Sequence, residues 1–159
     1  PVIKFMIRLM FVGLAGLVFA GCGATFEIEA PLDFVEREER DWSSYAYRAL
    51  NADAVVLGVR EIYEEKEASL AFWAKAVKNR LQASHSYAVI REEPISAASG
   101  EGGTLIRMGR EDGGVQYDYW LALFDAGETL YVVEIGGRRD AFEKVEDQLL
   151  GSITGFRVH

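Results

Sequence analysis

Residues 115–135 read VQYDYWLALFDAGETLYVVEI, and this stretch decides the fold. Successive side chains of a strand point to opposite faces, so Tyr119 and Leu121 face one way while Trp120 and Ala122 face the other. Apolar side chains therefore occupy both faces in the second half of the strand, which is typical of a strand that is covered on both sides. The sequence predicts a sheet with a helix on each face.

Turn signals on either side of this strand predict a meander of antiparallel strands. The dipeptide Asp112-Gly113 is a strong hairpin signal, and it follows a predicted strand at residues 104–110. Residues 125–128 (DAGE) form the next turn, before a strand at residues 129–135. Further strands are predicted at residues 26–30, 45–49, 54–59 and 87–91.

Two helices are predicted from apolar positions that recur at helical spacing. The first covers residues 66–83, and its apolar stripe consists of Leu70, Trp73, Ala74, Val77 and Leu81. Asp140 caps the second helix, and Glu143 completes a capping box. The stripe of the second helix consists of Phe142, Val145, Leu149, Ile153 and Phe156. The predicted class is therefore α+β, with an antiparallel sheet and two main helices.

Composition limits the class of protein. The chain has 159 residues, of which 50% are hydrophobic, and this is enough for one domain with its own core. The net charge of −8 argues against nucleic-acid binding. A single cysteine excludes an internal disulfide, and no cluster of Cys and His residues suits a structural zinc ion. No metal and no cofactor are expected.

The N-terminal segment has the three parts of a secretory signal peptide. Lys4 and Arg8 give it a positive start, residues 9–20 are uncharged and apolar, and small residues surround Cys22. The apolar run is short for a permanent membrane span, because a bilayer core is about 30 Å thick. The sequence predicts a signal peptide at residues 1–21 and a tether or loosely held first strand at residues 22–32. A single α+β domain is expected over residues 33–159.

The end of this segment, Phe19-Ala20-Gly21-Cys22, resembles the lipobox of bacterial lipoproteins, with Phe19 where leucine is more usual. The resemblance implies cleavage before Cys22 and acylation of that cysteine. Several acyl chains give stable membrane anchoring, where one chain would not. The expected location is a bacterial cell membrane or outer membrane, with the domain facing the periplasm or the exterior. An ordinary secretory signal with a chance cysteine is the alternative.

The order of elements resembles the PsbP superfamily, an α/β/α sandwich on an antiparallel sheet. The resemblance is carried by Phe72-Trp73 through Leu81, by residues 119–131 (YWLALFDAGETLY), and by Leu149, Leu150, Ile153 and Phe156. Members are mostly non-enzymatic, and some are accessory subunits of membrane complexes or bacterial lipoproteins. The resemblance implies a fold and a class of role, and it assigns no functional residue.

A search for catalytic motifs favours surface roles for the reactive residues. His85 lies in a predicted loop between two serines, and no nucleophile elbow accompanies it. The carboxylate pairs, such as Glu92 and Glu93, sit in charge-rich runs that are typical of solvated faces. The glycine-rich residues 100–104 lack the Lys-Ser/Thr pair of a phosphate loop. The chain is therefore expected not to be an enzyme, and a hydrolase is the least supported alternative.

Two features suggest binding surfaces. Tyr117, Tyr119 and Tyr131, with Tyr45 and Tyr47, lie in predicted strands and would line an apolar groove if one face of the sheet were incompletely covered. Phe72 stands on the polar side of the first helix, either against residues 26–30 of the same chain or against a partner protein. We expect the intramolecular contact at Phe72.

These observations predict a membrane-anchored, non-enzymatic lipoprotein of the bacterial envelope that acts as a binding or accessory module. Its partners would be the membrane, through acylated Cys22, and, as the alternative to the intramolecular contact, an envelope protein that docks at Phe72. A carrier or sensor of a small apolar ligand, held in the groove of tyrosines, is the alternative.

Overall fold

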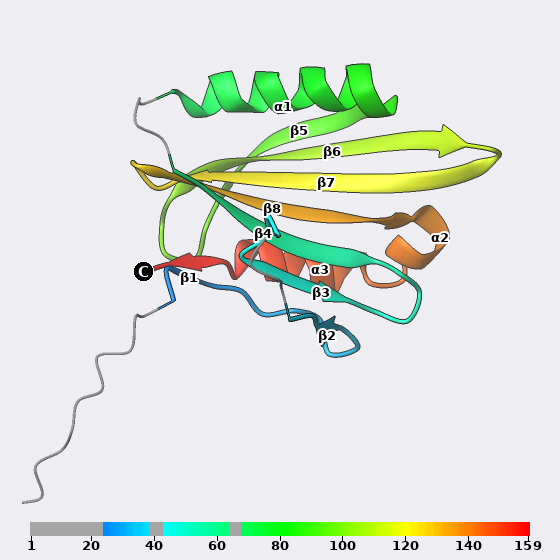
Figure 1. Cartoon of the computed structure of the whole chain (residues 1–159), viewed down its shortest axis with the longest axis horizontal. Helices are drawn as coiled ribbons and strands as arrows, with labels where there is room; N and C mark the ends of the chain where they lie inside the picture. The colour runs from blue at the N-terminus through cyan, green and yellow to red at the C-terminus, as the bar shows by residue number, and fades with distance from the viewer. Residues whose placement is uncertain (1–23, 39–42, 64–67) are drawn as a thin grey trace, which may run out of the picture.

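A computed structural model describes residues 24–38, 43–63 and 68–159 (Figure 1). The predicted signal peptide, Cys22 and the predicted start of the first helix at residues 66–67 lie outside these residues. Seven antiparallel strands form one sheet in the order β2-β3-β4-β8-β7-β6-β5, and two more form a small sheet, β1-β9. The strands are β1 (Phe26–Glu27), β2 (Val35–Glu36), β3 (Tyr47–Leu50), β4 (Val56–Tyr63), β5 (Ala88–Ser96), β6 (Gly102–Asp112), β7 (Val115–Asp125), β8 (Thr129–Arg138) and β9 (Arg157–Val158).

The helices are α1 (Leu70–His85), α2 (Arg139–Phe142) and α3 (Glu146–Thr154). Helix α1 covers one face of the large sheet, and α2 and α3 lie on the other (Figure 1). The predicted α/β/α layering is confirmed. Among the described residues, no helix combines the length and the apolar character that crossing a bilayer requires.

Strand β7 has the two-sided burial that its sequence predicts. Leu121 and Leu123 belong to the core under α1, together with Ile106, Met108 and Val132. Trp120, Ala122 and Phe124 belong to the core under α2 and α3, which also contains Val59, Val133, Ile135, Leu149 and Phe156. The sheet thus separates two apolar cores, and each needs its own helical cover.

The hairpin between β6 and β7 follows from its glycines. Gly113 and Gly114 have φ angles of 58° and 80°, a left-handed backbone conformation that glycine adopts without steric cost. Two such residues in succession suit the tight turn whose twist matches that of the flanking strands. The predicted hairpin is confirmed.

The helices differ from prediction at their ends. Helix α1 begins at Leu70, where the Ser69 hydroxyl accepts a hydrogen bond from the Phe72 N–H and caps the helix, and it continues to His85, beyond the predicted end at residue 83. The predicted second helix is two helices, α2 and α3, separated at Val145 (φ −121°, ψ 7°). The predicted capping box at Asp140 is wrong, since this residue lies inside α2 and its carboxylate binds Arg138.

The N-terminal segment is part of the fold from β1 onward. Phe26 pairs with Val158 of β9, and its ring stacks on that of Phe156 at 5.7 Å between centroids. Ile28 and Ala30 also pack against the core under α3. This segment therefore covers the sheet face opposite α1.

Phe156 lies between the N-terminal segment and the sheet, and it contacts both. It is fully buried, and its ring stacks on Phe124 at 5.2 Å and 10° as well as on Phe26. We expect Phe156→Ala to lower the free energy of unfolding by about 3–5 kcal/mol, because it leaves a cavity among rings that cannot close in. The exposed Phe72→Ala is the matched control, with an expected change within about 0.5 kcal/mol. Urea denaturation would measure both, and equal losses would contradict this account.

Candidate functional site

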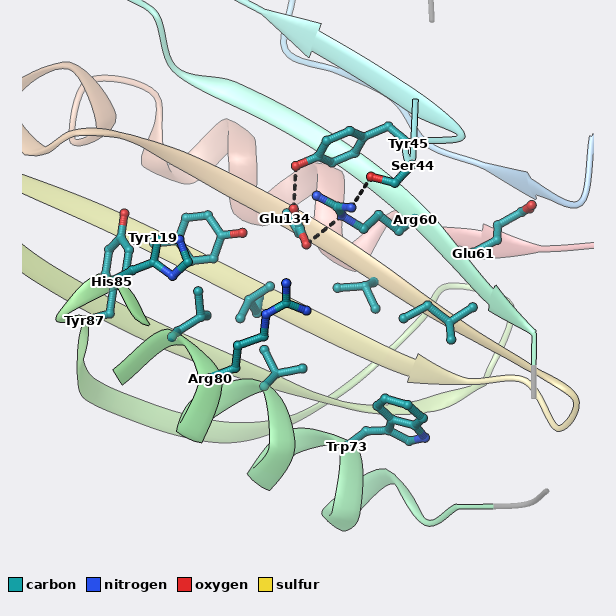
Figure 2. A pocket seen from close by; sticks show the side chains of 15 residues that line it. Ser44, Tyr45, Arg60, Glu61, Trp73, Arg80, His85, Tyr87, Tyr119 and Glu134 are labelled. Atoms are coloured by element: carbon teal, nitrogen blue, oxygen red, sulfur yellow. Dashed lines mark hydrogen bonds and ion pairs between the residues drawn. The ribbon is translucent and has the colours of Figure 1, made fainter. Parts of the chain in front are cut away.

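A groove of about 620 Å³ opens between α1 and the sheet (Figure 2). Its walls are mostly apolar. The helix contributes Trp73, Val77, Arg80, Leu81 and His85, the sheet contributes Arg60, Glu61, Ile62, Tyr119, Leu121, Val132 and Glu134, and the segments beside them contribute Ser44, Tyr45 and Tyr87. The volume lies in the range of about 300–1,000 Å³ that is usual for small-molecule sites.

The groove exists because α1 packs over β6 and β7 and leaves part of β4 and β8 uncovered. On this face β4 and β8 carry Gly58 and Gly136, which two tyrosine rings approach closely. A Cβ atom on Gly58 would lie 2.6 Å from Cε1 of Tyr45, and one on Gly136 would lie 2.8 Å from Cδ2 of Tyr119. Any side chain larger than that of glycine at either position would therefore clash with the tyrosine ring beside it.

Glu134 stands between these rings, and protein groups satisfy both of its carboxylate oxygens. The Arg60 Nε–H donates to one oxygen at 3.0 Å, and the Tyr45 hydroxyl donates to the other at 2.7 Å (Figure 2). Arg60 also donates to the Ser44 hydroxyl, and its guanidinium lies 3.9 Å from the centroid of the Tyr45 ring. The Glu134 side chain is only 14% exposed, so these contacts offset the free-energy cost of removing its charge from water.

The pKa values of Tyr45 and Tyr119 are both raised. Burial, and then the hydrogen bond and the charge of Glu134, raise the pKa of Tyr45 above its ordinary value. Burial also raises the pKa of Tyr119 strongly, with the negative charge of Glu134 as the next cause. Both hydroxyls therefore stay neutral in the physiological range.

The helical wall carries two groups of a different kind. Arg80 extends from α1 into the space between helix and sheet (Figure 2). Among the described residues, it has no hydrogen-bond or ion-pair partner. His85 lies at the end of α1, beside Tyr87 and Tyr119. In the described part of the chain, it likewise makes no hydrogen bond to Ser44 or to a carboxylate.

The structure separates the tyrosines that the sequence grouped. Tyr119 lines the groove, and Tyr117 lies further along β7, where the Arg110 guanidinium is 5.2 Å from its ring centroid. Tyr131 lies on the opposite face, because it is directly across from Phe124, and such cross-strand partners share a face. Its hydroxyl donates to the Thr25 carbonyl at 3.2 Å. Tyr45 faces the groove, whereas Tyr47 packs with the other core.

Phe72 does not make the intramolecular contact that we expected, and that interpretation was wrong. Residues 26–30 pack against the core under α3, on the far side of the sheet from α1. Phe72 remains 57% exposed, and its ring is perpendicular to that of Trp73, at 5.6 Å between the ring centroids. It therefore lies at the outer surface of the helix whose inner face lines the groove.

The carboxylates considered for catalysis are in ion pairs or on the surface. Glu92 pairs with Lys78, and Glu93 pairs with Arg107 at 3.0 Å. Within the described ranges, no group of three or more His, Cys, Asp and Glu side chains could hold a metal ion.

Sequence reasoning missed Glu134, Arg60 and Arg80. A signal for the first was present, since Glu134 is the one charged residue in the apolar predicted strand at 129–135. A lone carboxylate in such a run needs a partner. Arg60 follows directly on the apolar run 54–59, but only the pairing of β4 with β8 brings the two together.

The cluster predicts a loss of stability at high pH. A folded-state pKa above the unfolded value means that the stabilisation by Tyr45 is fully present below pH of about 10 and is lost as the pH rises through the folded pKa. We expect the free energy of unfolding to fall above pH 10, and to fall less steeply in Tyr45→Phe. Urea denaturation between pH 8 and pH 11 measures both slopes. Equal slopes would show that Tyr45 does not contribute.

We compared the sequence and the structure with those of known proteins. No protein-family model matches the chain, and no curated protein matches it by sequence. Among solved structures, cyanobacterial PsbP (CyanoP) from Synechocystis sp. PCC 6803 is similar, with a TM-score of 0.65, 13% identity and coverage of 85% of this chain and 87% of that one. LpqN of Mycobacterium tuberculosis, described as involved in cell envelope biogenesis, has a TM-score of 0.64 at 8% identity, over 84% of this chain and 82% of its own. The chain therefore has the PsbP-like α+β fold.

Proposed function

We propose that the chain is a non-catalytic binding module of the bacterial cell envelope, and that it binds a small, mainly apolar ligand in the groove under α1. The groove itself is the observation that carries this proposal. Trp73, Val77 and Leu81 line one wall, and Leu121 and Val132 line the other. Water in such a cleft gains few hydrogen bonds, so an apolar group that displaces it is favoured.

The state of the polar groups supports binding over catalysis. Glu134 and Arg60 neutralise each other, and the Tyr45 and Ser44 hydroxyls are engaged with them. A general base needs a free lone pair close to the proton that it removes, and a nucleophile needs such a base beside it. The Ser44 hydroxyl has Arg60 as its neighbour instead, and a guanidinium cannot act as a base.

Anchoring through Cys22 belongs to the same proposal. It is supported by the signal-like segment 1–21 and the lipobox-like residues before Cys22. It is also supported by the similar fold of LpqN, which is described as involved in cell envelope biogenesis. Acylation would confine the protein to a surface and so raise its effective concentration for membrane-bound partners or ligands.

A second candidate role is docking of an envelope protein at Phe72. The observation that favours it is the 57% exposure of this phenylalanine in a helix that lies at the outer face of the molecule. An exposed aromatic side chain can act as an anchor residue in a protein interface.

The groove can be tested by filling it. The full chain in phosphatidylcholine nanodiscs would be titrated calorimetrically with 1-octanol, with empty nanodiscs as the reference. We expect Val77→Trp to weaken binding by about tenfold or more, which corresponds to 1.4 kcal/mol, because the indole occupies the ligand's space. Asn79→Trp is the matched control on the exposed side of the same helix, and it should leave binding unchanged.

Absence of octanol binding by the unmodified chain would contradict the proposed ligand site. Equal weakening by both tryptophan variants would point to damage to α1 and not to occupancy of the groove.

Anchor and partner can be tested together in bacterial cells. We expect Cys22→Ala to move the protein from the membrane fraction to the soluble fraction, because the substituted residue cannot be acylated. A photo-reactive residue in place of Phe72 should give a discrete protein adduct that disappears in the Cys22→Ala background. The same photo-reactive residue at Lys75 serves as the positional control. An unchanged distribution after Cys22→Ala would contradict the anchor, and equal adducts from both positions would contradict docking at Phe72.

A further inference from the structure

We infer that the groove selects amphipathic monocarboxylates, with the carboxylate bound by Arg80 and the apolar chain lying between α1 and the sheet. This inference rests on the proposed ligand site and adds the charge and the head group of the ligand. It depends on three observations: a cation in the groove that has no partner among the described residues, the pairing of Arg60 with Glu134, and the apolar wall beside the cation.

The unpaired cation is Arg80. Its guanidinium projects from α1 toward the sheet, into the groove (Figure 2). Within the described ranges, neither a carboxylate nor another acceptor binds it. A chain with a net charge of −8 has many acidic residues that could pair with an arginine. An arginine that is directed into a cleft without such a pair is therefore available to a ligand anion.

The remaining charges of the groove do not compete for that anion. Arg60 forms an ion pair with one oxygen of Glu134 at 3.0 Å, and the Tyr45 hydroxyl donates a hydrogen bond to the other oxygen. Glu61, at the end of β4, accepts hydrogen bonds from Thr25 and from the Tyr63 hydroxyl. Figure 2 shows the Glu61 carboxylate directed away from α1. Among the described residues of the groove, Arg80 is thus the permanently charged cation that remains available to attract an anion.

The ligand must also be largely apolar. Val77 and Leu81 flank Arg80 on the helix, and Leu121 and Val132 face them from the sheet. Arg80 is exposed at the mouth of the groove, and its planar guanidinium can form two parallel hydrogen bonds with a carboxylate. A ligand with one carboxylate and an alkyl chain meets both conditions.

The test compares molecules that differ in the head group. The full chain in phosphatidylcholine nanodiscs would be titrated with octanoate, 1-octanol and octylamine, with empty nanodiscs as the reference. We expect octanoate to bind at least about tenfold more tightly than 1-octanol, which corresponds to 1.4 kcal/mol. Octylammonium should bind more weakly than either, because Arg80 repels it.

Two variants assign this preference to a residue. Arg80→Gln should bring the affinities for octanoate and 1-octanol within about twofold of each other, because octanoate loses its charged hydrogen-bonding partner. Lys75→Gln removes the same charge from the exposed side of the same helix, and it should keep the preference for octanoate. Retained octanol binding also reports that the Arg80→Gln variant is folded.

The outcomes separate the two proposals. If 1-octanol and octanoate bind equally well, or if Arg80→Gln keeps the preference, the groove binds apolar ligands but the inference about Arg80 is overturned. If neither compound binds, the proposed ligand site itself is overturned, and the inference with it.

Discussion

Strand β7 is buried on both faces, and the rest of the structure is arranged to keep water away from it. Leu121 and Leu123 are covered by α1, while Trp120 and Phe124 are covered by α2, α3 and the N-terminal segment. Burial of apolar area is the main favourable term in folding, so a two-sided strand fixes a three-layer architecture. The helical cover is not equal on the two sides, because α1 is a single helix over a seven-stranded sheet. The groove is the part of the sheet that one helix cannot cover.

A carboxylate in this part of the sheet lowers the stability of the fold unless other groups pair with its charge. Glu134 lies in the middle of β8, and an unpaired charge at such a place would destabilise the sheet. Arg60 and Tyr45 satisfy both oxygens, and the two glycines beneath the tyrosine rings make room for this arrangement. A cluster that is satisfied in this way is rigid, and it sets the shape of the groove floor.

The sequence predicts the layers better than it predicts the site. Alternation along β7, the Asp112-Gly113 turn and the stripe on α1 are local patterns, so each could be interpreted without knowing the partner strands. The site depends on pairing across the sheet instead. The contact of Arg60 with Glu134 joins residues of β4 and β8, and the separation of Tyr131 from Tyr119 follows from the register of β7 with β8. Phe72 shows the same limit, since only the path of residues 26–30 decides whether they reach it.

The N-terminal segment links the proposed anchor to the position of the groove. Phe26 is already held by β9 and by Phe156, so an acylated Cys22 would be at most about 14 Å of extended chain from the folded domain. A tether this short would keep the domain close to the membrane surface. Phe26 packs on the sheet face opposite α1, and the groove therefore lies across the sheet from the segment that would carry the proposed anchor. An anchor on one layer and a binding groove on the other would let the protein hold a ligand while its acyl chains remain inserted.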